Sequence, residues 1–351
     1  MIEINAPLHD SAVLYSAALP VDCAAVTDVG RNRENNEDTF ILSSLWNDSA
    51  LLAVAIDGMG GYSGGEVAAA IAAEEILDYL QASPNGLRET LLRQALVAAN
   101  NKIFEARSHM PEYSSMGCVV TAVLVDFEKP AICMAHVGDT RLYRLAGDAF
   151  AKLSHDHSFV GYMEETGELS EEEAMAHPRR NVIQRALGLE RLTPDSEYVE
   201  TAVFPVLPGT SLMLCSDGLC DMVRSAEMSE ILSDSTTTPL EKAEALVNAA
   251  NKAGGKDNVT VLVLSFIDTN KPRVGEHLQE QSLPPVQPPP IPDELIAAAN
   301  TGITIEIPAD TPAKAPSSKM NLGEMLLLGF EILVFLAMIG AFVFMLCASA
   351  A

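Results

Sequence analysis

The sequence has few positive charges and lacks several motifs that would assign a function at once. Only 22 Lys and Arg residues stand against 48 Asp and Glu, which gives a formal net charge of −26. This balance excludes a nucleic-acid binder that works by neutralising phosphates. It favours either an acidic soluble surface or a site that collects hard cations. The chain also has no Gly-x-x-x-x-Gly-Lys loop, which excludes a P-loop nucleotide hydrolase.

The cysteines show no disulfide or metal spacing, since none of the six belongs to a Cys-x-x-Cys pair. Several lie inside apolar runs, which is typical of reduced, buried thiols in a protein that faces the cytosol. No Lys or Arg precedes Arg31. The N-terminus therefore lacks the positively charged start of a secretory signal peptide.

Apolar runs and turn residues alternate between residues 21 and 268, and 48% of the chain is apolar, which is ample for a core. Short apolar runs predict strands at 21–27, 40–45, 51–56, 118–127, 131–137, 141–145, 150–153, 211–216 and 259–266. Apolar residues at helical spacing predict helices at 64–81, 87–107, 226–232 and 240–250. Residues 158–195, called the flap below, are polar and irregular and are expected beside a site. Residues 1–20 have no clear period and are expected to form an N-terminal extension.

The stretch from Thr27 to Asp38 concentrates polar groups between two predicted strands. It contains Arg33 and an Asn-Glu-Asp triplet that ends in Glu37 and Asp38. The Gly and Asn residues of the stretch place these side chains in a loop or at a strand start. A solvated hairpin loop would have the same composition, so its interpretation depends on the rest of the chain.

Aspartates recur where buried strands end or begin. Asp57 follows one apolar run and precedes Gly58, Asp217 follows another, and Asp257 precedes the last strand. Asp139 lies in a Gly-Asp-Thr turn. One such residue is ordinary turn chemistry, but a folded sheet would bring several together. Clustered carboxylates are stable only with a cation, and oxygen-only ligands select Mg²⁺ or Mn²⁺ over Zn²⁺.

Other polar residues near these turns give weaker signals. Asp217 and Asp221 are four residues apart across a helix start, so both can face one point. The His155-Asp156-His157 triplet has the composition of a metal site, but its two rings should diverge. A role in which these residues orient metal ligands is therefore favoured over direct ligation. Arg179 and Arg180 could meet an anionic substrate, although a salt-bridged surface role is favoured.

Six blocks, in this order, resemble those of the metal-dependent protein serine/threonine phosphatases of the protein phosphatase 2C class. They are Thr-Asp-Val-Gly-x-x-Arg-x-x-Asn-Glu-Asp (27–38), Asp-Gly-Met-Gly-Gly (57–61), Met-Gly-x-x-x-Thr (116–121), Val-Gly-Asp-Thr-Arg (137–141), Ser-Asp-Gly-Leu (216–219) and Asp-Asn-Val-Thr (257–260). The resemblance covers residues 22 to 267. It implies an α+β fold, a four-layer αββα sandwich of two antiparallel β-sheets flanked by helices.

The resemblance also implies a site for two bridged Mn²⁺ or Mg²⁺ ions. The implied direct ligands are Asp38, Asp57, the Gly58 carbonyl, Asp217 and Asp257, and Glu37 is implied to bind through water. A third, weaker site is implied at Asp139, Asp217 and Asp221. Arg33 matches the arginine that binds the substrate phosphate in this family.

The implied chemistry is hydrolysis of phosphoserine and phosphothreonine by a metal-bridging hydroxide. Two metals lower the pKa of a shared water, and Arg33 can offer a bidentate fork to two phosphoryl oxygens. A surface arginine in an acidic loop is the plainer alternative for Arg33, and the metal motifs favour phosphate binding. Some relatives have His where Met59 stands, assigned there to protonating the leaving alkoxide, and Met59 cannot do this. Cysteine-phosphatase chemistry is excluded, because the residues six positions after Cys215 and Cys118 are Asp221 and Leu124.

The composition changes beyond residue 268. Residues 269–321 include a Pro-rich run and predict an extended linker. Residues 325–348 are almost wholly apolar and would reach about 36 Å as a helix, enough to span a bilayer. Lys314 and Lys319 precede this span and no charged side chain follows it, a pattern that favours a cytoplasmic location for the N-terminal side.

The sequence therefore predicts a metal-dependent phosphatase domain at 21–268 with a single C-terminal membrane anchor. Expected partners are phosphoprotein substrates near the membrane, among them a cognate serine/threonine kinase, and no nucleic acid. The alternative is a catalytically inactive, membrane-tethered binding module, against which the complete ligand set argues. A sibling phosphatase acting on anti-sigma-type regulators is a further alternative, but those relatives tend to lack the block that runs from Arg33 to Asp38.

Overall fold

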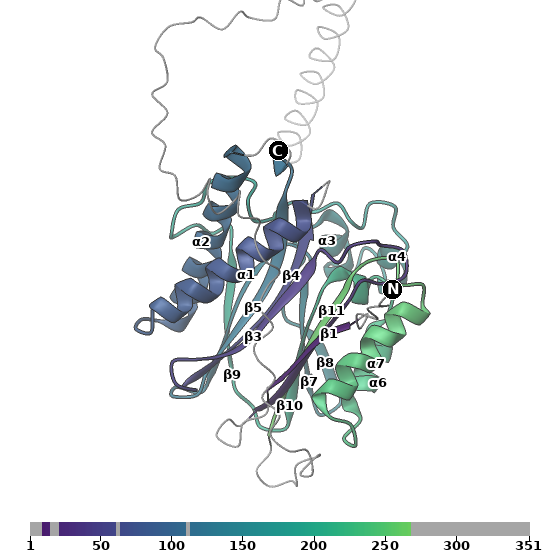
Figure 1. The fold of residues 1–351 in the computed structure, drawn as a ribbon. Coiled ribbons are helices and arrows are strands. Elements are labelled where there is room, and N and C mark those ends of the chain that lie inside the picture. The colour runs from purple at the N-terminus through teal and green to yellow at the C-terminus, as the bar shows by residue number, and fades with distance from the viewer. Residues whose placement is uncertain (1–8, 15–20, 61–63, 110–112, 268–351) are drawn as a thin grey trace, which may run out of the picture. The chain divides into compact units, whose positions relative to one another are not determined.

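The computed structural model describes residues 9–14, 21–60, 64–109 and 113–267, which fold into four layers (Figure 1). Helices α1 (Gly64–Ala82) and α2 (Arg88–His109) cover one β-sheet, and helices α6 (Ser225–Ser233) and α7 (Pro239–Lys252) cover the other. Both sheets lie between the two helical layers. The predicted αββα sandwich is therefore confirmed.

Both sheets are antiparallel throughout. The larger contains, in spatial order, β1 (His9–Leu14), β2 (Val21–Asp28), β11 (Val259–Phe266), β10 (Thr210–Cys215), β7 (Arg141–Ala146) and β8 (Ala149–Lys152). The smaller contains β3 (Asp38–Leu45), β4 (Ala50–Met59), β5 (Gly117–Asp126), β6 (Ala131–Val137) and β9 (Glu200–Pro205). Strands from distant parts of the sequence are thus neighbours, because β2 from the N-terminal part pairs with β11.

Three apolar clusters separate the four layers, and β4 shows why its sequence is continuously apolar. Leu52, Val54 and Ile56 pack toward α1 and α2. Leu51 and the alternate residues of the same strand pack against the larger sheet. Since successive side chains point to opposite faces, a strand between two cores must be apolar at every position. The third cluster, which includes Leu246, lies between the larger sheet and α6 and α7.

The structure adds elements that the sequence analysis did not predict. Residues 9–14, assigned to an extension, form β1 and pair with β2, and β9 completes the smaller sheet. The flap, expected to be irregular, contains helices α3 (Phe159–Glu165) and α4 (Glu171–Met175). A capping box between Ser170 and Glu173 starts α4, so part of the acidic run caps a helix instead of only covering the surface.

In the part of the chain that the structure describes, no helix combines the length and apolar character needed to cross a bilayer. The predicted linker at 269–321 and the predicted span at 325–348 lie outside the described residues.

Candidate metal centre

The predicted acidic residues meet at one end of the sandwich because the strands that carry them are antiparallel. Asp38 begins β3 and lies opposite Asp57 near the end of β4 in the strand ladder. Asp217 lies two residues after the end of β10, and Asp257 lies two residues before the start of β11, the neighbour of β10. The exit of one antiparallel strand and the start of the next lie at the same edge. Both sheets therefore deliver their aspartates to a common region.

Asp139 reaches the same edge from the turn between β6 and β7. Arg141, at the start of β7, is the ladder partner of Cys215 at the end of β10, so the turn lies beside Asp217. Burial raises the pKa of Asp139 to about 7, and the nearby carboxylates of Asp156 and Asp221 add to the effect. Asp139 thus belongs to the acidic cluster predicted from sequence.

Mutual repulsion among these carboxylates shows how closely they are gathered. Burial raises the pKa of Asp57 well above its usual range, and Asp38, Asp217, Asp139 and Asp257 raise it further. Burial, Asp139 and Asp221 likewise raise the pKa of Asp217. A buried cluster of like charges is unfavourable unless something neutralises it. The donors are all oxygens, so the residues present fit hard divalent cations such as Mg²⁺ or Mn²⁺.

Asp38 is the most enclosed member of the cluster and is held by hydrogen bonds. Burial raises its pKa to about 7, and hydrogen bonds from Ser216 and Thr260 oppose that rise. The Ser216 hydroxyl donates to Asp38 Oδ2 at 2.7 Å and accepts from the Thr260 amide at 2.9 Å. Ser216 therefore fixes one carboxylate oxygen by joining β10, β11 and β3.

Asn258 holds the loop that contains Arg33 and Glu37. Its side-chain oxygen accepts from the Glu37 amide at 2.8 Å, and its amide group donates to the carbonyls of Val29 and Asn35, each at 2.9 Å. The sequence analysis assigned no role to Ser216 or Asn258. Their position was the available signal, since each adjoins a predicted ligand within one of the six blocks that carry the resemblance.

Arg33 and Glu37 lie at the rim of the acidic cluster. Arg33 Nη2 donates to Asp257 Oδ2 at 2.7 Å while 47% of the Arg33 side chain stays exposed. Glu37 is half-buried, burial raises its pKa, and its carbonyl accepts from the Gly58 amide at 3.1 Å. The structure therefore brings both residues, and the Gly58 backbone, to the predicted site.

Two glycines allow backbones to approach closely at this edge. A Cβ on Gly218 would lie 1.9 Å from the Asn258 carbonyl oxygen, and a Cβ on Gly58 would lie 2.1 Å from the Gly65 carbonyl oxygen. Any side chain there would force these segments apart. Gly218 thus permits the segments after β10 and before β11 to meet.

The flap contributes a positively charged side chain, that of Arg180, to the neighbouring acidic residues. Arg180 Nε contacts the Asp221 carboxylate, and both residues line a cavity of about 30 Å³ together with Asp139 and Asp217. Arg179 instead stacks over Phe159, with its guanidinium carbon 5.4 Å from the ring centroid. The salt-bridged role favoured for these arginines therefore applies to Arg180, at the edge of the acidic cluster.

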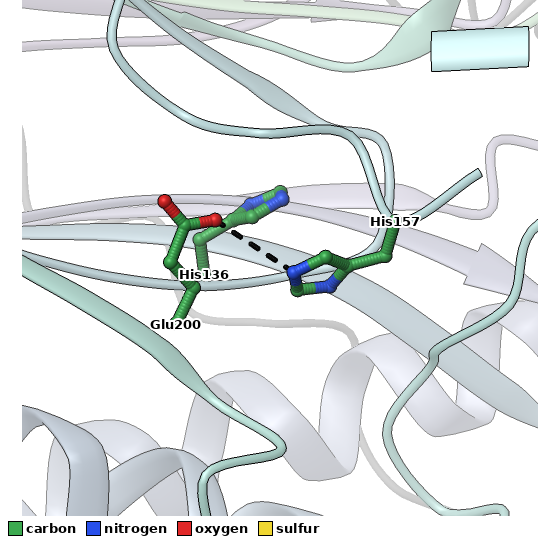
Figure 2. Close-up of side chains that lie close together, drawn as sticks. All are labelled: His136, His157 and Glu200. Carbon is green, nitrogen blue, oxygen red and sulfur yellow. Dashed lines mark ion pairs between the residues drawn. The ribbon is translucent and has the colours of Figure 1, made fainter. Parts of the chain in front are cut away.

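The two histidines of the 155–157 triplet do not diverge as predicted. His155 Nδ1 lies 2.8 Å from Glu200 Oε1, and His157 Nε2 lies 3.7 Å from Glu200 Oε2. Figure 2 shows His157 and Glu200 beside His136, and one ligand atom from each of the three lies within 4.8 Å of the others. The rings converge because both turn toward the Glu200 carboxylate on β9, a strand that the sequence analysis did not predict.

Comparisons with known proteins agree with this arrangement. A family model described as protein phosphatase 2C matches residues 29–252. The serine/threonine phosphatase stp of Listeria monocytogenes serovar 1/2a is 37% identical over 251 residues, which are 70% of this chain and 96% of that protein. The protein phosphatase PhpP of Streptococcus pneumoniae R6 is 33% identical over 252 residues, 70% of this chain and 98% of that protein.

Solved structures show the same similarity in three dimensions. The Mycobacterium tuberculosis serine/threonine phosphatase PstP/Ppp superposes with a TM-score of 0.61 at 31% identity, covering 71% of this chain and 99% of that one. The catalytic domain of the serine/threonine protein phosphatase PstP, in complex with two manganese ions, gives a TM-score of 0.60 at 29% identity, with the same coverage of 71% and 99%.

Gly218→Ala should destabilise the protein, because the added Cβ would collide with the Asn258 carbonyl group. Overpacking of this kind typically costs about 1–3 kcal/mol of unfolding free energy, which urea unfolding would measure. Gly64→Ala is a matched control, since the nearest atom to its Cβ would be Met116 Cβ at 3.2 Å, with Met116 Cα at 3.7 Å and Tyr113 Cδ1 at 3.9 Å. Wild-type stability of Gly218→Ala would contradict the close approach of the two segments.

Proposed function

The chain belongs to the protein phosphatase 2C family, and from this premise we propose that it is a metal-dependent phosphatase that hydrolyses phosphoserine and phosphothreonine in proteins. Its relatives in Listeria and Streptococcus are named serine/threonine phosphatase and protein phosphatase. The observation that carries the proposal is the convergence of Asp38, Asp57, Asp217 and Asp257 beneath Arg33.

The acidic cluster is the proposed site for two Mn²⁺ or Mg²⁺ ions. Asp38, Asp57, Asp217 and Asp257 would hold them with the Gly58 carbonyl, and Glu37 would contribute through water. When bound, such ions supply Lewis-acid activation of the attacking water. Asp139 and Asp221 would form a third, weaker site with Asp217. The manganese complex of a similar catalytic domain supports the choice of ion.

Arg33 is the proposed phosphate-binding residue. Its contact with Asp257 orients the guanidinium at the rim of the cluster, while about half of the side chain remains accessible to a substrate. A guanidinium presents donors in a fixed fork that matches two phosphoryl oxygens. Met59, at the end of β4, carries no exchangeable proton, so the leaving group must take its proton from another source.

An inactive binding module is the alternative to an enzyme. Such a protein would have no use for buried carboxylates that repel one another, since their cost is recovered only by binding cations. The hydrogen bonds that orient Asp38 and Glu37 likewise support a working site. Calorimetric titration with Mn²⁺ separates the two functions, because the module requires no bound ions.

We also propose that the enzyme is held at the membrane by residues 325–348, with the catalytic domain in the cytoplasm. The apolar run and the Pro-rich segment before it support this proposal. The substrates would then be phosphoproteins at the membrane, including a transmembrane serine/threonine kinase that this phosphatase opposes.

Asp217→Asn should abolish phosphatase activity while leaving the metal-free protein as stable as wild type or more so. The change removes one of several repelling charges but also removes a ligand from the proposed ions. We expect a loss of at least about 10²-fold in kcat, and Mn²⁺ should no longer raise the melting temperature. Phosphopeptide hydrolysis and thermal unfolding, each with and without chelator, measure both effects. Full hydrolysis by wild type in excess chelator would refute metal dependence.

Arg33→Ala should lower kcat/KM for a phosphopeptide by about 10- to 100-fold, as expected for losing charged hydrogen bonds of about 1.5–3 kcal/mol. Arg33→Lys should recover only part of this loss, because an ammonium cannot form the fork. Arg31→Ala is the control, since Arg31 is exposed in the same loop. Steady-state kinetics that leave Arg33→Ala and Arg31→Ala indistinguishable would remove Arg33 from the phosphate site.

Deleting residues 325–348 should move the protein from the membrane fraction to the supernatant without changing its kinetics on a soluble phosphopeptide. The helix would provide the membrane affinity, whereas the described domain holds the proposed site. Fractionation of cells that express either form measures the shift. Recovery of the full chain in the supernatant would contradict the anchor.

A further inference from the structure

The cluster of His136, His157 and Glu200 has the spacing of a metal site, but the hydrogen bonds of His136 occupy both of its ring nitrogens (Figure 2). His136 Nε2 lies 3.0 Å from each of two carbonyl oxygens, those of Gly138 and His155. Carbonyl oxygens only accept, so Nε2 carries the ring proton. Nδ1 then accepts from the Thr121 hydroxyl at 2.9 Å. The one lone pair of the His136 ring, on Nδ1, is therefore already engaged by Thr121 and is not free for an ion.

His157 is fixed in one tautomer by a backbone amide. The Gly138 N–H donates to His157 Nδ1 at 3.1 Å, and an amide can only donate. In the neutral ring the proton is therefore on Nε2, which faces Glu200 Oε2 at 3.7 Å. A metal at Nε2 would need that proton to move to Nδ1, where it would oppose the Gly138 N–H. This cluster is therefore a hydrogen-bonded assembly and not an ion site.

His157 forms hydrogen bonds with both the carbonyl and the amide of Gly138. The His157 amide donates to the Gly138 carbonyl at 2.7 Å, while the Gly138 amide donates to the His157 ring. Gly138 has a φ of +112°, and a Cβ there would lie 2.1 Å from Val119 Cγ1. Glycine adopts this φ without strain but also has the most conformational freedom to lose, so hydrogen bonds to its backbone restrict the turn. His157 supplies partners for both polar backbone groups of the residue that precedes Asp139.

His157 also connects this turn to the flap. Its carbonyl accepts from the Gln184 amide at 2.7 Å, and the next residue, Ser158, pairs with Ile183 in an isolated β-bridge. Burial, followed by the neighbouring charges of His136 and Arg185, lowers the pKa of His157 to about 3. The ring is thus neutral at physiological pH and keeps its acceptor.

We propose that His157 is a positioning residue, whose Nδ1 lone pair fixes the Gly138 turn and so places the Asp139 carboxylate for a weakly held third cation. The role of Asp139 rests on the proposed phosphatase function. The role of His157 in holding the turn does not, because it is a property of the folded chain.

The test compares two substitutions on the full chain. His157→Asn retains an acceptor, because Asn Oδ1 lies where Nδ1 does along the side chain, whereas His157→Leu has similar bulk and no acceptor. In His157→Leu, amide hydrogen exchange at residues 138–140 should be about 3- to 10-fold faster, in line with one lost hydrogen bond. The weakest Mn²⁺ binding step in calorimetry should weaken by a similar factor. His157→Asn should stay within about twofold of wild type.

His155→Leu is the matched control, because His155 is exposed and lies two residues away. It should leave exchange at residues 138–140 unchanged. Wild-type behaviour of His157→Leu, or equal loss in the Asn and Leu variants, would overturn the proposal. ¹⁵N chemical shifts of the wild-type ring give a second measurement that needs no variant. A protonated Nδ1, or Zn²⁺ binding that Glu200→Gln abolishes, would also overturn it.

The failure of this proposal and that of the proposed function can be told apart. Exchange and ring shifts are read in the metal-free protein whether or not it hydrolyses phosphopeptides. A wild type without phosphatase activity, but with a slow Gly138 amide that only His157→Leu accelerates, would refute the function and keep the positioning role.

Discussion

Repulsion among buried carboxylates is the constraint on which this structure depends. Asp38, Asp57, Asp139, Asp217 and Asp257 come from separate elements, yet each lies near the others at one edge of the sandwich. Burial and mutual repulsion both disfavour charged carboxylates in this arrangement, so the rest of the fold must hold them together. The stability of the three apolar clusters is what makes this possible. An acidic pocket of this kind has one evident use, which is to gather multivalent cations.

Hydrogen-bond donors around the pocket offset only part of this charge. Ser216 and Asn258 provide neutral donors that orient a carboxylate and a loop, and Arg33 and Arg180 each pair with one aspartate at the rim. Neutral donors fix direction without cancelling charge. The remaining negative potential in the centre of the site is therefore available to metal ions, while Arg33, with about half of its side chain exposed, is the proposed partner of a phosphate group.

The sequence predicted most of the central strands because their two buried faces require unbroken apolar runs, as in β4. It also predicted the aspartates at strand ends, since antiparallel pairing brings such positions to one edge. It did not predict β9, which is half-exposed at the edge of its sheet and therefore carries no continuous apolar signal. Without β9 the approach of Glu200 to His155 and His157 could not be foreseen, and the contact between Arg180 and Asp221 depends on tertiary packing in the same way.

Each of the two sheets contributes two of the four aspartates of the proposed site. Asp38 and Asp57 belong to strands of the smaller sheet, and Asp217 and Asp257 flank strands of the larger one. Ions held by all four would therefore cross-link the two inner layers. A ligand that binds only the folded state at 100 times its dissociation constant adds about 2.7 kcal/mol of stability. Starvation for manganese or magnesium would then expose the chain to proteolysis, and the amount of this protein in a cell would follow the metal supply.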